Sequence, residues 1–183
     1  MNSDRTEKVA SRAAELLDHA VTELRIGTHL LAQHRFYQLK AQAALFNFEV
    51  ACDVTTLLKV APRSFSRKVI LKNLLHRVFE YDKTLRQSHF KAIAALAGER
   101  GLSKRHQQFL AFATDWTAQM SSISKYKTLR NKTSGHYDQD VGLLVSLIEN
   151  IDPDETLDLV KHFLALNVDY LQHMSSIGNK RDA

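Results

Sequence analysis

The chain contains few of the residues that cross-link, bend or interrupt a polypeptide. Its 183 residues include one cysteine, Cys52, two prolines and six glycines. A single cysteine excludes an intramolecular disulfide and a cysteine-based zinc site, and with them a secreted fold held together by disulfides. In an apolar stretch such a residue usually serves as a small buried hydrophobic side chain. The scarcity of proline and glycine leaves long uninterrupted stretches that favour helix.

Several sequence features of membrane proteins and nucleotide-binding enzymes are also missing. No run approaches the roughly 18 apolar residues that a membrane span needs, and the charged N-terminal stretch is unlike a signal peptide. Neither a G-x-x-x-x-G-K-[ST] nor a G-x-G-x-x-G loop is present. A G-x-S-x-G nucleophile elbow is absent too. We therefore expect a cytoplasmic protein without a membrane partner.

Apolar residues recur at spacings of three and four along most of the chain, which indicates amphipathic helices. Strand-like alternation, internal repeats and low-complexity segments are absent. The pattern predicts one all-α domain over residues 1–183, a bundle of four or five long helices with short connections. The expected helices cover 3–34, with a bend or break at Gly27; 35–60; about 64–98, with a break near Asp82; 103–130; 143–149; and 153–178.

Start signals support several of these boundaries. Ser3 and Ser103 are candidate N-caps, and Ser64 or Ser66 follows Pro62, which ends the preceding helix. The clearest signal is the segment 152–155, Asp-Pro-Asp-Glu. It combines an N-cap aspartate, proline at the first helical position and a glutamate placed to complete a capping box.

Charge is strongly segregated along the sequence. Residues 59–132 hold 16 Lys and Arg against 4 Asp and Glu, a balance of +12, whereas residues 133–183 hold 3 against 9, a balance of −6. A basic block of this size is the electrostatic pattern of a surface that meets polyanions. Alternatively, folding brings the acidic tail over the basic block and neutralises it. The sequence favours neither reading.

A metal site receives only weak support. The Glu-x-x-His pairs of di-metal helical bundles are absent. Asp158, His162, Asp169 and His173 share nearly one helix face and could bind a metal, but a solvated polar face is the commoner origin of such a stripe. We expect no metal and no cofactor.

Arg130 and His136 form the most informative pair in the chain. Arginine presents a fixed fork of donors to a phosphate, and histidine transfers protons near neutral pH. In a straight helix a six-residue step places the two side chains about 120° apart. Gly135 could end the helix in a left-handed turn and let His136 fold back toward Arg130. The alternative is that both residues simply cap the helix C-terminus.

The string 130–138, Arg-Asn-Lys-Thr-Ser-Gly-His-Tyr-Asp, resembles the signature of the HEPN superfamily. That signature is an arginine, then a polar residue, then a histidine after a gap of four to six residues, and the gap here is five. The string looks most like the abortive-infection branch of the superfamily. Its setting agrees, because the motif ends a late helix of a small all-α chain and another helix follows.

The resemblance implies a metal-independent endoribonuclease of the toxin or antiviral-effector type. Its site would form at a homodimer interface where two copies of the motif face each other. Arg130 and His136 would be the catalytic pair and Asn131 the polar residue that orients them. A ribose 2′-hydroxyl, deprotonated by His136, would attack the adjacent phosphate while Arg130 stabilises its charge. An antitoxin or regulatory protein is a further expected partner.

RNA is the expected substrate, and the basic block supplies candidate contacts to it. Lys125, Lys127 and Lys132 flank the motif, and Arg67 and Lys68 could extend the track along the phosphates.

Aromatic residues beside the motif offer a second kind of contact. Tyr126 and Tyr137 could stack on unpaired bases, although ordinary packing is the commoner role for Tyr126.

Two departures from the family pattern stand out. No acidic residue lies between Trp116 and His136, and tyrosine stands one position after the histidine rather than two. Two other functions remain open. One is a non-catalytic module of the same fold that binds nucleic acid or a protein partner, and the other is an unrelated structural or regulatory bundle.

Overall fold

The computed structural model describes residues 3–27, 31–133 and 141–178. This part of the chain is helical, with short turns and no strand. The predicted all-α class is therefore confirmed. The helices are α1 (Ser3–Gly27), α2 (Leu31–Lys59), α3 (Phe65–Thr84), α4 (Phe90–Glu99), α5 (Ser103–Gln119), α6 (Lys127–Thr133), α7 (Val141–Glu149) and α8 (Pro153–Gly178).

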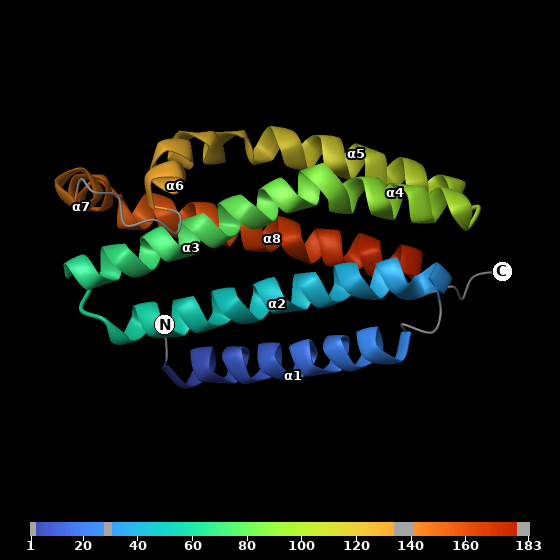
Figure 1. Ribbon diagram of the computed structural model, residues 1–183, viewed down its shortest axis with the longest axis horizontal. Coiled ribbons are helices and arrows are strands. Elements are labelled where there is room, and N and C mark those ends of the chain that lie inside the picture. Colours follow the sequence, from blue (N-terminus) through green and yellow to red (C-terminus); the bar gives the residue numbers. More distant parts are fainter. Residues whose placement is uncertain (1–2, 28–30, 134–140, 179–183) are drawn as a thin grey trace.

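The long helices lie roughly along one direction (Figure 1). The helices α1 and α2 form a pair at one edge, α3 packs on α2 and α8, and α4 and α5 form the opposite edge. The short helices α6 and α7 lie together at one end of the bundle, where both contact α3. None of the helices in the described ranges combines the length and the apolar character needed to cross a bilayer.

Two hydrophobic cores hold the bundle. The larger is rich in aromatic residues from α2, α3, α5 and α8, including Phe46, Trp116, Phe163 and Tyr170. The smaller core lies at the end of the molecule formed by α6 and α7. It consists of Leu57, Leu71, Leu75, Leu129, Ile148 and Ile151. Leu129 in this second core fixes α6, and hence its neighbour Arg130, against α3.

The structure corrects several predicted boundaries. Helix α1 ends at Gly27, where a bend or break was predicted, but residues 31–34 belong to α2 rather than to the first helix. The expected break near Asp82 is instead a π-helical segment, Leu85–His89, in an otherwise continuous helix from α3 into α4. There the Phe90 amide donates to the Leu85 carbonyl five residues back, so the register shifts without ending the helix.

The predicted caps had mixed outcomes. Ser64 caps α3, its hydroxyl accepting from the Arg67 amide at 3.2 Å. Asp152 caps α8 by accepting from the amides of Asp154 and Glu155, both at 2.9 Å. The capping box is only half formed, because the Glu155 carboxylate turns to Lys125.

Two further predictions about the helix that leads to Arg130 were wrong. Ser103 is the first residue of α5 rather than its cap. The helix that was expected to reach Arg130 ends at Gln119, and a 3-10 segment, Ser121–Tyr126, leads into the separate α6. Met120 and Ile123 are buried beside the core, and their burial accounts for the change of direction without any break in the apolar pattern.

Candidate functional site

Arg130 projects from α6 onto α3. Its Nε and Nη2 both contact Oε1 of Glu80, and its Nη1 donates to Oδ1 of Asn131 at 2.9 Å. The guanidinium also lies over the ring of Phe79, 5.6 Å from the centroid. With 27% of its side chain exposed, Arg130 is held in one orientation yet remains open to solvent on one side.

Glu80 supplies the acidic partner of the motif from a distant part of the chain. Its side chain is 37% exposed, and its second oxygen lies 4.0 Å from Lys83 Nζ. The sequence between Trp116 and His136 contains no acidic residue. Packing of α6 on α3 supplies one instead, 50 residues upstream of Arg130.

The imidazole of His76 belongs to the same cluster. His76 lies one helical turn before Glu80 on α3. Burial lowers the pKa of His76, and the positive charges of Arg130, Lys72 and Arg77 lower it further against the opposing effect of Glu80. Its Nδ1 is buried, with no hydrogen-bond partner among the residues that the structure describes. The lowered pKa favours the uncharged form of this imidazole near neutral pH.

The cluster has a definite chemical capacity. Arg130 offers guanidinium donors to an oxyanion, and Glu80 and Asn131 fix the direction of the fork. The carboxylate of Glu80 also competes with any bound phosphate for the same charge. An anion bound here must share Arg130 with Glu80 or displace the carboxylate.

Of the other two predicted catalytic residues, the structure describes Asn131 but not His136. Asn131 is exposed and contacts Arg130, as its position next to it in the chain allows. His136, Tyr137 and the turn proposed at Gly135 lie outside the described residues.

The structure finds intramolecular partners for several residues of the predicted RNA track. Arg67 Nη1 donates to the Leu57 carbonyl at 2.8 Å, and Lys68 Nζ donates to the Glu149 carbonyl. These bonds cap the C-terminal ends of α2 and α7.

The lysines nearer the motif are distributed differently. Lys125 pairs with Glu155 and lies over the Tyr126 ring, 4.9 Å from the centroid. Lys125, Lys127 and Lys132 are all exposed.

The charge segregation is thus partly compensated within the fold. Glu155, from the acidic tail, forms an ion pair with Lys125. Glu49 and Asp53 of α2 bind Arg77 at 2.8 and 2.6 Å, so acidic residues of the N-terminal region contribute as well.

The polar stripe on α8 is divided by its surroundings. His162 and Asp169 are exposed, but the ring of His173 lies against Phe112, with centroids 4.8 Å apart. In the described part of the chain, no group of three or more His, Cys, Asp or Glu side chains is placed to hold a metal ion.

Sequence reasoning missed Glu80 and His76. The available signal was their spacing of four residues on a helix that also carries Lys72. That spacing is common, and only the position of α6 shows that Arg130 completes the cluster. Comparison with protein-family models, curated proteins and solved structures finds no match.

Proposed function

We propose that the protein is a metal-independent endoribonuclease whose site contains Arg130, Asn131 and His136. The observation that carries the proposal is the side chain of Arg130, which is 27% exposed and is oriented by Glu80 and Asn131. It lies on the helix that leads into the segment bearing His136. An arginine held this way suits the charge that develops on a phosphorane.

The proposed reaction needs only protein side chains and RNA. His136 takes the proton of a ribose 2′-hydroxyl, whose oxygen attacks the adjacent phosphorus. The bond to the 5′-oxygen breaks, and that oxygen is protonated as it leaves. The products carry a 2′,3′-cyclic phosphate and a 5′-hydroxyl. DNA is not a substrate, because it lacks the attacking group.

The primary test is cleavage of single-stranded RNA in excess EDTA. Wild-type protein is expected to cleave it, Arg130→Ala should lower cleavage roughly 10²- to 10³-fold, and His136→Ala should lower it at least as much. Arg12→Ala, which removes an exposed arginine of α1, is the control and should leave activity unchanged. Activity that persists in both site variants would refute this assignment.

A homodimer that shares the site is part of the proposal. The test mixes inactive Arg130→Ala with inactive His136→Ala. A shared site predicts that mixed dimers regain activity, since one of their two sites then combines an intact Arg130 with an intact His136. If no activity returns although mass spectrometry shows mixed dimers, each site belongs to one chain.

The second candidate is a non-catalytic module that binds nucleic acid or a protein partner. The observation that favours it is the ion pair between Arg130 and Glu80, together with the binding of Arg67 and Lys68 to the chain's own carbonyls. Such a module would bind RNA without cutting it, with an affinity that falls steeply as salt rises. The EDTA assay, run beside a binding assay, separates the two functions.

A further inference from the structure

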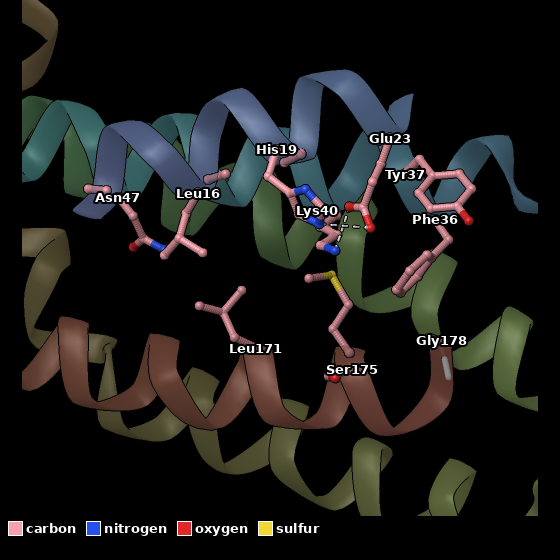
Figure 2. Close-up of a pocket in the computed structure, with 14 residues that line it drawn as sticks. Leu16, His19, Glu23, Phe36, Tyr37, Lys40, Asn47, Leu171, Ser175 and Gly178 are labelled. Carbon is pink, nitrogen blue, oxygen red and sulfur yellow. Dashed lines mark hydrogen bonds and ion pairs between the residues drawn. The ribbon is translucent and has the colours of Figure 1, made fainter. Parts of the chain in front are cut away.

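A cavity of about 350 Å³ lies between α1, α2 and α8 (Figure 2). The helices α1 and α2 form one side of it, and Leu171 and Ser175 of α8 approach from the other. Its volume is within the range of small-molecule sites, at the lower end. It belongs to different helices from the cluster around Arg130, so the inference drawn from it does not depend on the proposed nuclease activity.

Small side chains on one wall create this space. Ala13 and Ala20 lie two turns apart on the same face of α1, and Ala44 lines the cavity from α2. Alanines at these positions cannot reach across to Leu171 and Met174 of α8. A leucine at any one of the three would fill part of the volume, which gives the cavity a simple steric test.

The end wall of the cavity is shaped by close aromatic packing. The ring of Phe36 lies against Gly178, where even a Cβ atom would clash with it, and Tyr37 packs in the same way against Gly27. Figure 2 shows both rings closing the end of the cavity next to the C-terminus of α8. The two glycines thus allow the rings to form a wall.

A connected polar group lines this mostly apolar space, with the His19 side chain 66% exposed at its edge. Lys40 Nζ donates to Glu23 Oε2 at 2.5 Å, and His19 Nε2 lies 3.4 Å from the other oxygen of Glu23. Side-chain exposure is 36% for Lys40 and 28% for Glu23. Asn47 and Ser175 add an amide and a hydroxyl to the lining.

The charges of this polar group define the head of a matching ligand. The positive charge of Lys40 and the negative charge of Glu23 cancel, so a charged head gains attraction from one and repulsion from the other. An uncharged head that both accepts and donates hydrogen bonds can use the ammonium and the carboxylate together. The apolar walls fit a short hydrocarbon or aromatic body.

We propose that this cavity binds a small uncharged amphiphile, with a hydroxyl or amide head at Lys40 and Glu23 and an apolar body between α1 and α8. The ligand would join α1, which packs chiefly on α2, to α8. Binding therefore stabilises the α1 edge of the bundle against local opening.

The test compares four probes with the same chain length: 1-octanol, octanamide, octanoate and octylammonium. Calorimetric titration of the full chain is expected to give at least tenfold tighter binding of the alcohol and the amide than of either ion. Ala44→Leu should weaken alcohol binding at least tenfold. Ala41→Leu is the matched control, because Ala41 lines the groove on the other side of α1, and it should bind as wild type does.

A second variant keeps the test decisive if Ala44→Leu does not fold. In the double variant Glu23→Leu with Lys40→Met, the preference for the alcohol over the ions should disappear while the apolar body still binds. The proposal is overturned if octanoate or octylammonium binds wild-type protein as tightly as octanol. It is equally overturned if none of the four probes binds, or if Ala41→Leu weakens binding as much as Ala44→Leu.

Discussion

Glu80 and Asp82 lie only two residues apart on α3, and each pairs with an arginine. The two pairs differ in their surroundings. Asp82 is 1% exposed, accepts from Trp116 Nε1 at 2.8 Å and pairs with Arg86 one turn along the same helix. Glu80 is 37% exposed and pairs with Arg130 of a separate, short helix. The first pair joins α3 to the aromatic core, whereas the second faces solvent at the end of the bundle.

The two regions each contain a histidine with a lowered pKa. His89 is buried between Tyr170, whose hydroxyl lies 3.1 Å from Nδ1, and Gln42, whose Oε1 lies 2.6 Å from Nε2. Burial lowers the pKa of His89 to about 4. His76 is only half-buried, and its pKa is lowered both by burial and by neighbouring cations.

The difference between the regions lies in what their partners leave accessible. In the buried set both ring nitrogens and both carboxylate oxygens are occupied by the fold itself. Such a set contributes stability and a defined packing. In the second set the carboxylate itself is accessible, 37% exposed for Glu80 against 1% for Asp82, and the buried Nδ1 of His76 has no partner among the described residues. The same residue types thus lie in two settings, which differ chiefly in the exposure of the carboxylate.

Asp82→Ala should produce the largest effect and only on stability. It removes the acceptor for Trp116 Nε1 in the core and the partner of Arg86, whose side chain is 36% exposed. We expect the free energy of unfolding to fall by about 3–5 kcal/mol, measured by urea denaturation. Asp115→Ala, at an exposed carboxylate of α5, is the control and should change it by less than about 0.5 kcal/mol. An equal loss of unfolding free energy in the two variants would contradict the structural role of Asp82.

Arg130→Ala should show the opposite behaviour. RNA cleavage is expected to fall roughly 10²- to 10³-fold, as on loss of one donor to a developing oxyanion. The free energy of unfolding should change by no more than about 1 kcal/mol, because the ion pair with Glu80 is partly exposed. A variant that loses activity only in proportion to unfolded protein would contradict the division between the regions.

The pH dependence of stability should reveal the buried histidine, His89. The folded-state pKa of His89, about 4, is below its ordinary value of 6.5, so the unfolded chain binds the proton first as pH falls. Stability from this group is complete above pH 6.5 and is lost toward pH 4, by on the order of 2–3 kcal/mol. Urea denaturation at pH 7 and pH 4.5 measures the loss, and His89→Gln should reduce it.

His162→Gln provides the control for that experiment, since His162 is exposed on α8. Burial raises the pKa of Asp82, which acts with the opposite sign, and the comparison between variants removes this contribution. If the His89→Gln and wild-type proteins lose equal stability between pH 7 and 4.5, the assignment to His89 is wrong.

Glu80→Gln should have a smaller, two-sided effect. The variant keeps the shape of the side chain but removes the charge that orients Arg130. We expect kcat to fall on the order of tenfold because the guanidinium is less well positioned. RNA binding should tighten at the same time, because a competing carboxylate is gone. Single-turnover cleavage and equilibrium binding measure the two effects, and a weaker affinity would contradict the competition.

The smallest effect is expected at Lys72. Lys72 is half-buried on α3, and its charge lowers the pKa of His76, so it lies beside the cluster. If it contacts one RNA phosphate, Lys72→Ala should lower the slope of log affinity against log salt by about 0.7. Lys91→Ala, at an exposed lysine of α4, should leave the slope unchanged. Equal slopes for wild type and Lys72→Ala would show that Lys72 does not contact an RNA phosphate.

Local signals in the sequence were sufficient for much of the fold. Asp152 and Pro153 marked the start of α8, and Pro62 and Ser64 marked the turn before α3, because capping depends on neighbouring residues. The end of α5 at Gln119 could not be predicted, since apolar spacing continues across it and only tertiary packing turns the chain.

The candidate site was likewise predicted only where local sequence signals were enough. Arg130 and Asn131 came from a short motif, whereas Glu80 joins Arg130 from 50 residues away. That contact depends on the core around Leu129, which holds α6 against α3. No spacing rule along the chain contains this information.

The most direct test of the central claim uses a DNA oligonucleotide that carries a single ribonucleotide, incubated with wild-type protein in EDTA. We expect one cut, immediately 3′ of the ribonucleotide, with a 2′,3′-cyclic phosphate on one product and a 5′-hydroxyl on the other. His136→Ala should leave the oligonucleotide intact. Cleavage at deoxyribonucleotides, or products with a 3′-hydroxyl and a 5′-phosphate, would contradict attack by the 2′-hydroxyl and with it the proposed function.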